Sequence, residues 1–329
     1  MEAQLDDFEF LALERLSLTA AGADIHERIG KAAHQLRFLD LYKPRKGKLS
    51  WDLSSMHQLD ELSIDGSYSE CGHEVILMIG SAPRLTTLRL ARITILGSQE
   101  HKATSIPSLL SLHLRCVKIE CKLGLPVLKT LVMQESKISN GKMHPLMLPS
   151  LTSLEIAWAR DEDDLCIRTP ALDVLDLTFS TTTSTHLIVK SLLDNSIVMG
   201  QMSPRRFRLQ IDSIKAGDLI TILTHMPRLE EWTFLGTITS PKSFFDKLAG
   251  RSLGATKGRT TNKVPLCPSM TTVFFDIRTW NSTNAANVEQ WYEETIRVRR
   301  KGKYPIKEAF WFLKESKSGK YGSGECVRL

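Results

Sequence analysis

One stretch of ten residues, SAPRLTTLRL at 81–90, decides the fold of this chain. Its leucines Leu85, Leu88 and Leu90 stand at the first, fourth and sixth positions of a six-residue pattern. The last two leucines fit a strand, because alternate strand residues share a face, whereas the whole spacing fits one face of a helix poorly. Pro83 has no N–H and disfavours helix in the residue before it. The stretch therefore predicts a turn followed by a strand.

The same pattern recurs along the chain, with other large apolar residues replacing some leucines. Clear copies open at Leu13, Leu36, Leu59, Leu85, Leu109, Leu128, Leu151 and Leu172, and looser copies include Leu209, Leu229 and Met270. A proline stands two residues before seven of these openings, at Pro83, Pro107, Pro126, Pro149, Pro170, Pro227 and Pro268. Units of roughly 20–29 residues that cannot bury their own apolar face stack side by side as a solenoid. We predict an α/β solenoid of about eleven repeats, with a curved parallel sheet on the concave face and helices or irregular returns on the convex face.

The returns between the predicted strands differ in character. Apolar residues lie on one helical face over 73–80, 186–193, 216–225 and 243–248. The returns over 117–124 and 137–146 are too short or too rich in turn residues for a full helix. We expect one solenoid over 1–329: regular repeats over 1–177, irregular repeats over 178–279 with a basic loop at 249–263, and a capping helix and strand over 280–329.

These units resemble leucine-rich repeats of the ribonuclease-inhibitor-like kind. More narrowly, SAPRLTTLRL at 81–90, MPRLEEW at 226–232 and the helix and strand predicted over 288–299 and 306–313 resemble the repeat region of fungal F-box proteins. The resemblance implies protein binding, such as substrate recognition in a ubiquitin ligase. We recognise no F-box in the sequence, because residues 13–41 already fit the repeat, so contact with the ligase adaptor does not follow.

The repeats depart from the usual unit, which carries Asn or Cys three positions after its last leucine. Those positions hold Ala21, Pro44, Ser67, Ile93, Val117, Ser136, Ala159 and Ser180. We therefore expect other groups to satisfy the backbone at these turns.

Strand alternation places the third, fifth and seventh residues of each unit on the concave face. We predict that this face binds a protein, because arginines and aromatic residues are enriched in binding hot spots. The candidate binding residues are Phe38, Tyr42, Arg89, His113, Arg115, Gln134 and Glu155. The alternative is that they are ordinary exposed side chains of a sheet, and that the partner uses another face.

Candidates for chemistry are weak. CGHE at 71–74 groups a thiol, an imidazole and a carboxylate, but catalytic dyads usually converge from distant segments, so we predict a helix start there. DEDD at 161–164 lacks the alternating ligands and glycine of a calcium loop. The six cysteines form no Cys-x-x-Cys pair. We predict no enzyme activity, no cofactor and no metal.

The formal net charge is +6, and the basic surplus lies in the C-terminal third. RRFR at 205–208 and RVRRK at 297–301 favour, as an alternative function, binding of nucleic acid or another anionic surface, although such short runs are usually solvated. The surplus is modest, so we favour a protein partner over nucleic acid. No apolar run approaches the roughly 18 residues of a membrane span, and the acidic start MEAQLDD at 1–7 is unlike a signal peptide. We expect a cytoplasmic or nuclear protein.

Overall fold

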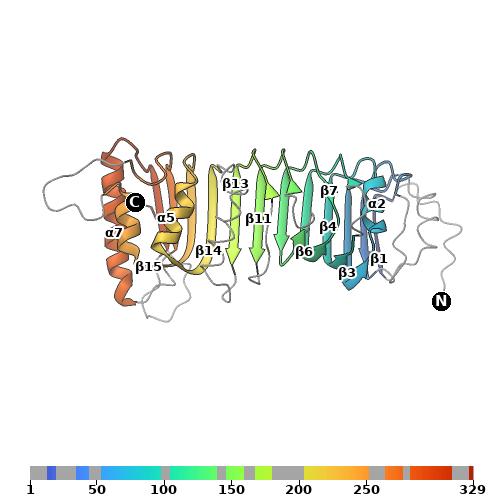
Figure 1. The fold of residues 1–329 in the computed structure, drawn as a ribbon, viewed down its shortest axis with the longest axis horizontal. Helices are drawn as coiled ribbons and strands as arrows, with labels where there is room; N and C mark the ends of the chain where they lie inside the picture. Colours follow the sequence, from blue (N-terminus) through green and yellow to red (C-terminus); the bar gives the residue numbers. More distant parts are fainter. Residues whose placement is uncertain are drawn as a thin grey trace. The chain divides into compact units, whose positions relative to one another are not determined.

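The structure is a computed structural model. It describes residues 13–19, 35–43, 53–97, 104–138, 146–158, 167–179, 204–251, 264–276, 282–312 and 326–328. They fall into two compact units, which we describe separately (Figure 1). Unit 1 comprises residues 1–154 and 165–171, and unit 2 comprises residues 155–164 and 172–329.

Unit 1 is a stack of parallel strands that pair in the order of the sequence. They are β1 (Arg15–Thr19), β2 (Phe38–Tyr42), β3 (Glu61–Cys71), β4 (Thr87–Ile95), β6 (Ser111–Ile119) and β8 (Thr130–Gln134). The returns contain helix α2 (Glu74–Ser81) and the short strands β5 (Thr104–Ser105), β7 (Leu123–Gly124), β9 (Lys137–Ile138), β10 (Leu146–Met147) and β12 (Ile167–Arg168). Strand β11 (Ser153–Trp158) crosses the boundary into unit 2.

Unit 2 has the same strand pattern but carries more helices among the described residues. Its strands are β13 (Val174–Phe179), β14 (Arg206–Lys215), β15 (Glu231–Thr239), β16 (Thr272–Asp276), β17 (Glu308–Phe312) and β18 (Cys326–Arg328). Adjacent strands are parallel from β13 to β17, and β18 is antiparallel to β17. Helix α6 (Pro241–Leu248) packs against both α5 (Ala216–Thr224) and α7 (Ser282–Lys301).

All eleven predicted strands are present, and each unit is an α/β leucine-rich-repeat solenoid. Three of the helical returns that we predicted appear as α2, α5 and α6, while the one at 186–193 lies outside the described residues. The returns that we judged too short for a helix form brief strands instead. The closing helix and strand are α7 and β17. The acidic run at 161–164 and most of the basic loop, residues 252–263, lie outside the described residues.

A turn explains the fixed position of the prolines. In the repeat that contains Pro107, the N–H of Leu109 donates to the carbonyl of Ile106 at 3.4 Å. Pro107 therefore occupies the second position of a β-turn, where its fixed φ is favourable. The equivalent bonds run from Leu128 to Leu125, Leu151 to Leu148, Leu229 to Met226 and Met270 to Cys267.

A backbone ladder fixes the register where each strand begins. The carbonyl of Asp60 accepts the N–H groups of Thr86 at 2.9 Å and Thr87 at 3.0 Å, one repeat further on. The same double acceptance occurs at the carbonyls of Glu14, Arg37, Thr86, Leu110 and Lys129 in unit 1 and of Asp173, Arg205, Glu230 and Thr271 in unit 2. Main-chain atoms therefore align the strands of these repeats with one another.

The backbone has a left-handed kink one residue before the position that usually carries Asn or Cys. The kink residues have φ between 49° and 53° and are Lys43, Arg92, Cys116 and Glu135. Beyond the kink the chain pairs again, as Ile93–Ile95 with Val117–Ile119. Buried Ser136 also contributes, because its Oγ accepts the N–H of Val117 at 3.0 Å. The prediction that other groups satisfy these turns is confirmed in this part of unit 1.

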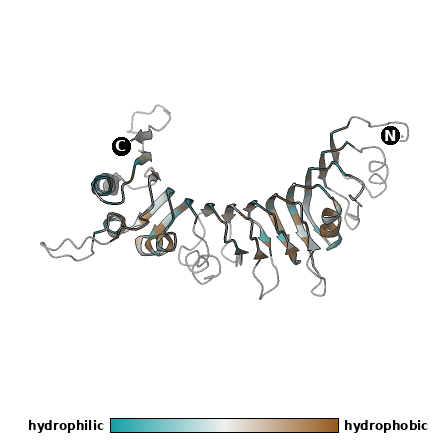
Figure 2. Cartoon of the chain, turned by 90° about the horizontal axis from the view of Figure 1, so that it is seen from above, coloured by the Kyte–Doolittle hydropathy of each residue, from teal (hydrophilic) through white to brown (hydrophobic). Residues whose placement is uncertain are grey.

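The cores of the two units differ in composition. In unit 1, leucines and isoleucines of alternate strand positions pack against the returns, where α2 buries four apolar residues (Figure 2). In unit 2 the core contains the rings of Trp232, Phe234, Phe244, Phe245, Phe275 and Tyr292, with neighbouring ring centroids 5.1–6.2 Å apart. No helix in the described residues has the length and apolar character to cross a membrane.

Arg299 of α7 corrects our expectation that the basic run at 297–301 is solvated, because its side chain is buried. Its guanidinium donates to five main-chain carbonyls, those of Tyr304 at 2.7 Å, Leu266 at 3.0 Å, and Leu248, Cys267 and Met270 at 3.3 Å each. Burial lowers the pKa of Arg299. The side chain therefore joins α7 to the end of α6 and to the segment before β16.

Candidate interaction surface of unit 1

We call the sheet face formed by the alternate, less buried residues of β1, β2, β3, β4, β6 and β8 the open face of unit 1. Six predicted binding residues lie on it: Phe38, Tyr42, Arg89, His113, Arg115 and Gln134. Tyr42, Arg89, Arg115 and Gln134 are exposed, while Phe38 and His113 are half-buried. The seventh residue, Glu155, belongs to unit 2. Their role in binding stays a prediction.

The centre of this surface is an ion pair across the sheet. Arg92, in the kink after Ala91 of β4, reaches Asp65 of β3 with Nε 3.0 Å from Oδ1 and Nη2 2.5 Å from Oδ2. Burial alone raises the pKa of Asp65, but Arg92, the N–H of Ser67 and the charge of Arg115 together hold it below its usual value. The two-point contact fixes the plane of the guanidinium.

Two tyrosines flank this guanidinium. The Cζ atom of Arg92 is 5.9 Å from the ring centroid of Tyr42 and 5.9 Å from that of Tyr68. The ammonium of Lys43 lies 5.2 Å from the Tyr42 ring. Contact with Arg92 and the charge of Lys43 lower the pKa of the Tyr42 hydroxyl. A cation that lies over the face of an aromatic ring is attracted to it electrostatically, so these side chains stabilise one another's positions.

A bulge in β3 presents Tyr68. Three residues, 66–68, stand opposite Arg92 alone, and the register with β4 resumes only at Ser69. A Cβ on Gly66 would lie 2.9 Å from the carbonyl oxygen of Arg92, so glycine is required there. Asp65 closes the bulge by accepting the N–H of Ser67 at 3.0 Å. Tyr68 has φ 67° and is 74% exposed.

Sequence reasoning missed Tyr68, Lys43 and Arg92, because strand alternation alone does not locate kinked residues. A signal for the bulge does exist in the sequence. Asp65-Gly66 is a turn-forming pair, and it falls in the longest interval between the clear openings, from Leu59 to Leu85. Of the predicted residues, Tyr42 contacts the central cluster of Asp65, Tyr68 and Arg92 directly, and Arg115 acts on Asp65 through its charge.

Three other predicted residues of unit 1 have contacts of their own. Arg89 pairs with Glu61 at 2.7 Å, and Phe38 receives the guanidinium of Arg15 at 4.7 Å from its ring. His113 shares a hydrogen bond of 2.9 Å with Ser111. In unit 2, burial raises the pKa of Asp176. The charge of Arg208 opposes this shift, and the charge of Glu155 adds to it.

The sequence CGHE at 71–74 does not form a nucleophilic pair in the structure. His73 shares a hydrogen bond of 3.0 Å with Thr104, and the Cys71 thiol faces Ser69 at 3.8 Å. Burial raises the pKa of Cys71, which opposes the thiolate that a nucleophile needs. Helix α2 begins at Glu74, as predicted. Within the described ranges, no three His, Cys, Asp or Glu side chains gather as metal ligands.

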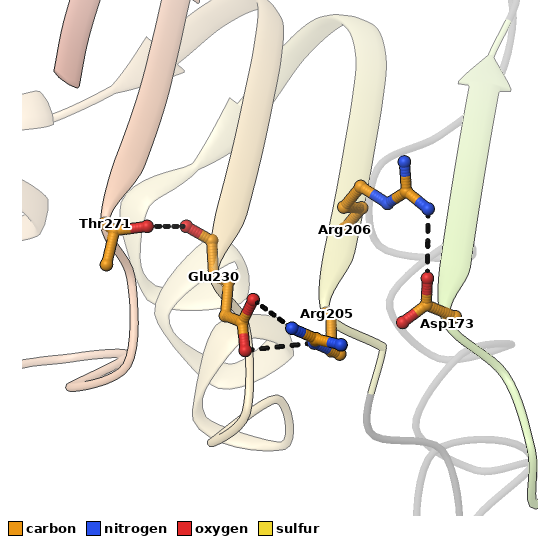
Figure 3. Close-up of polar contacts among 5 residues, drawn as sticks. All are labelled: Asp173, Arg205, Arg206, Glu230 and Thr271. Atoms are coloured by element: carbon orange, nitrogen blue, oxygen red, sulfur yellow. Dashed lines mark hydrogen bonds and ion pairs between the residues drawn. The ribbon is translucent and has the colours of Figure 1, made fainter.

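The arginines at 205–208 in unit 2 are paired with carboxylates in or directly before the neighbouring strands, and Figure 3 shows the pairs of Arg205 and Arg206. Arg205 binds both carboxylate oxygens of Glu230, at 3.0 and 2.8 Å, and Arg206 binds Asp173 at 3.0 Å. Arg208 lies 3.4 Å from Asp176. The Glu230 carbonyl accepts the Thr271 hydroxyl at 3.4 Å. These arginines therefore link strands and have little uncompensated charge to offer to phosphate.

The chain has little similarity to known proteins. No protein-family model and no curated protein sequence matches it. A crystal structure of a complex of TLR13 with ssRNA13 is similar, with 13% sequence identity and a TM-score of 0.38. The match covers 79% of this chain and 41% of that chain, so this chain spans less than half the length of that protein. The fold assignment rests on the strand ladders described above.

Proposed function

We propose that this chain is a non-enzymatic scaffold that binds another protein through the open face of unit 1. The bulge of β3 is the observation that carries the proposal. A bulky residue with positive φ costs about 1–3 kcal/mol, and such strain tends to lie at functional sites. Here the strain serves to expose the ring of Tyr68 beside Arg92 and Tyr42. Tyrosine and arginine are typical anchors of protein interfaces.

The test compares proteins captured by the tagged full chain and by its Tyr68→Asn variant. Asparagine tolerates the left-handed conformation, so this variant keeps the fold while removing the ring. The control is Leu77→Gln, which removes a 54% exposed side chain from α2. We expect the partner to be lost from Tyr68→Asn and retained by Leu77→Gln, as measured by quantitative mass spectrometry. Equal capture by Tyr68→Asn and the unaltered chain would contradict the proposal.

The resemblance to fungal F-box proteins supports, as a narrower proposal, substrate recognition in a ubiquitin ligase. The same captures test it, because a ligase component would then copurify with the partner. The alternative, binding of nucleic acid through the C-terminal third, draws less support from the ion pairs of Arg205, Arg206 and Arg208. A steep loss of binding with added salt would favour that alternative.

A further inference from the structure

We propose that the partner presents an extended acidic segment that crosses β2, β3, β4 and β6 at the kinked end of the open face. The segment carries two acidic side chains four residues apart, one for Lys43 and one for Arg115, and an apolar side chain midway between them. This inference rests on the proposed function and specifies the chemistry of the partner.

Two exposed cations that form no ion pair among the described residues define the ends of the site. Within the described part of the chain, Lys43 and Arg115 form no ion pair, whereas Arg37, Arg89 and Arg92 each pair with a carboxylate of β3 or of the residue before it. Both side chains are exposed. Lys43 follows Tyr42, the last residue of β2, and Arg115 is the residue of β6 that stands in register with Tyr42. Charge complementarity therefore calls for two anionic groups.

The strand order sets the distance between those groups. β2 and β6 are separated by β3 and β4, so three strand spacings of about 4.8 Å give roughly 14 Å. An extended peptide advances about 3.3 Å per residue, so four residues cover about 13 Å. Residues i, i+2 and i+4 of such a peptide face the same side. Two acidic residues and the residue midway between them therefore all face the sheet.

The middle of the site is suited to an apolar side chain. It lies over β3 and β4, where the ring of Tyr68 is exposed and the charge of Arg92 is neutralised by Asp65. The ring of Tyr42 also lies 5.9 Å from the Arg92 guanidinium. The aromatic ring and the paired guanidinium offer contact area without an unpaired charge. A leucine or proline of the partner can therefore pack there without burying an uncompensated charge.

A single strand of RNA is the rival occupant, because bases stack on tyrosine rings. Its backbone repeats a negative charge at every nucleotide and is bound by a continuous track of cations. Between Lys43 and Arg115 the intervening arginine, Arg92, is already paired with Asp65. The two separated cations therefore fit a segment with two anionic groups better than a polyanion.

The experiment selects phage-displayed random peptides of about twelve residues on the full-length chain. Enriched peptides are then measured by fluorescence anisotropy, with a labelled single-stranded RNA of similar length in parallel. We expect enrichment of two acidic residues at i and i+4 with an apolar residue at i+2. Lys43→Glu and Arg115→Glu should each weaken binding of such a peptide about tenfold. Lys122→Glu, which reverses an exposed charge in a return of unit 1, is the matched control and should change nothing.

A charge swap makes the test independent of folding defects. A peptide with lysines in place of its two acidic residues should bind poorly to the unaltered chain and better to the Lys43→Glu/Arg115→Glu double variant. Failure of this rescue, enrichment of no peptide, or tighter binding of the RNA would overturn the acidic segment. Enriched peptides that lack acidic residues but depend on Tyr68 would overturn it while leaving the proposed function standing. Capture results that are insensitive to Tyr68→Asn would contradict both.

Discussion

Arg92 in unit 1 and Arg299 in unit 2 carry the same guanidinium in opposite surroundings. Arg299 is 2% exposed and donates to five backbone carbonyls. Arg92 lies at the surface, pairs with Asp65 and supports two partly or largely exposed tyrosines. One arginine consolidates a core and the other organises a surface. The difference shows that the same group can serve as a buried donor to main-chain carbonyls in unit 2 and as a surface ion-pair partner in unit 1.

The largest effect is expected from Arg299→Met. The shorter side chain leaves up to five buried carbonyls without their donor, and leaving buried polar groups unpaired in this way typically costs about 3–5 kcal/mol. Hydrogen exchange followed by mass spectrometry should show loss of protection in β15 and β16 and little change in β3 and β4. Arg297→Met, which removes a 68% exposed guanidinium two residues away in α7, is the control. Equal protection in Arg299→Met and the unaltered chain would break the comparison.

A smaller effect is expected from Gly66→Ala in the bulge of unit 1. The new Cβ would meet the Ser69 hydroxyl at 2.8 Å and the carbonyl oxygen of Arg92 at 2.9 Å, so the bulge must shift. We expect the free energy of unfolding, measured with urea, to fall by about 1–3 kcal/mol. The matched control is Gly217→Ala in α5 of unit 2, where a Cβ meets nothing within 4 Å. That variant should gain up to about 1 kcal/mol, since alanine favours helix. An unchanged free energy of unfolding in Gly66→Ala would show that the bulge is not sterically fixed.

Asp65→Asn should alter the pH dependence of stability. The pKa of Asp65 is lowered in the folded chain, so its ion pair stabilises the fold above the ordinary carboxyl pKa. That contribution is lost as the pH falls through the lowered pKa. The unaltered chain should therefore be more stable than Asp65→Asn at about pH 7, and the difference should shrink toward about pH 3. Asp40→Asn, on the same face, is the control for loss of a carboxylate. A difference that stays constant with pH would argue against the pair.

The smallest effect is expected from Arg205→Ala in unit 2. The pair with Glu230 has two well-made hydrogen bonds, but its side chains are 52% and 41% exposed. Exposed ion pairs contribute little because water and salt screen them. The urea midpoint should shift barely measurably, and the shift should vanish at high salt. A large shift of the urea midpoint would mean that surface arginines also stabilise unit 2. The contrast between Arg92 and Arg299 would then depend on the unit in which an arginine lies, and not on its burial.

The strands were predictable because they depend on local spacing. The positions of Leu85, Leu88 and Leu90 determine which residues face the core, and proline marks the turn before seven of the strands. The central cluster was not predictable in the same way. Asp65 and Arg92 meet only because two repeats align, and a bulge of residues 66–68 changes the count between them. Arg299 was mistaken for a solvated residue because its acceptors are main-chain carbonyls, which leave no mark in the sequence.

The ladder at the strand starts has a consequence for how such a sequence can drift. The acceptor in each repeat is a main-chain carbonyl, and the residues that supply it are as different as Asp60, Leu110 and Lys129. Any residue offers that oxygen, so substitution there leaves the alignment of the repeats intact. Lineages can therefore diverge in sequence at this edge while the architecture persists. The same tolerance makes the edge a practical place for engineering, where labels or attachment chemistry can be introduced once per repeat at a defined spacing.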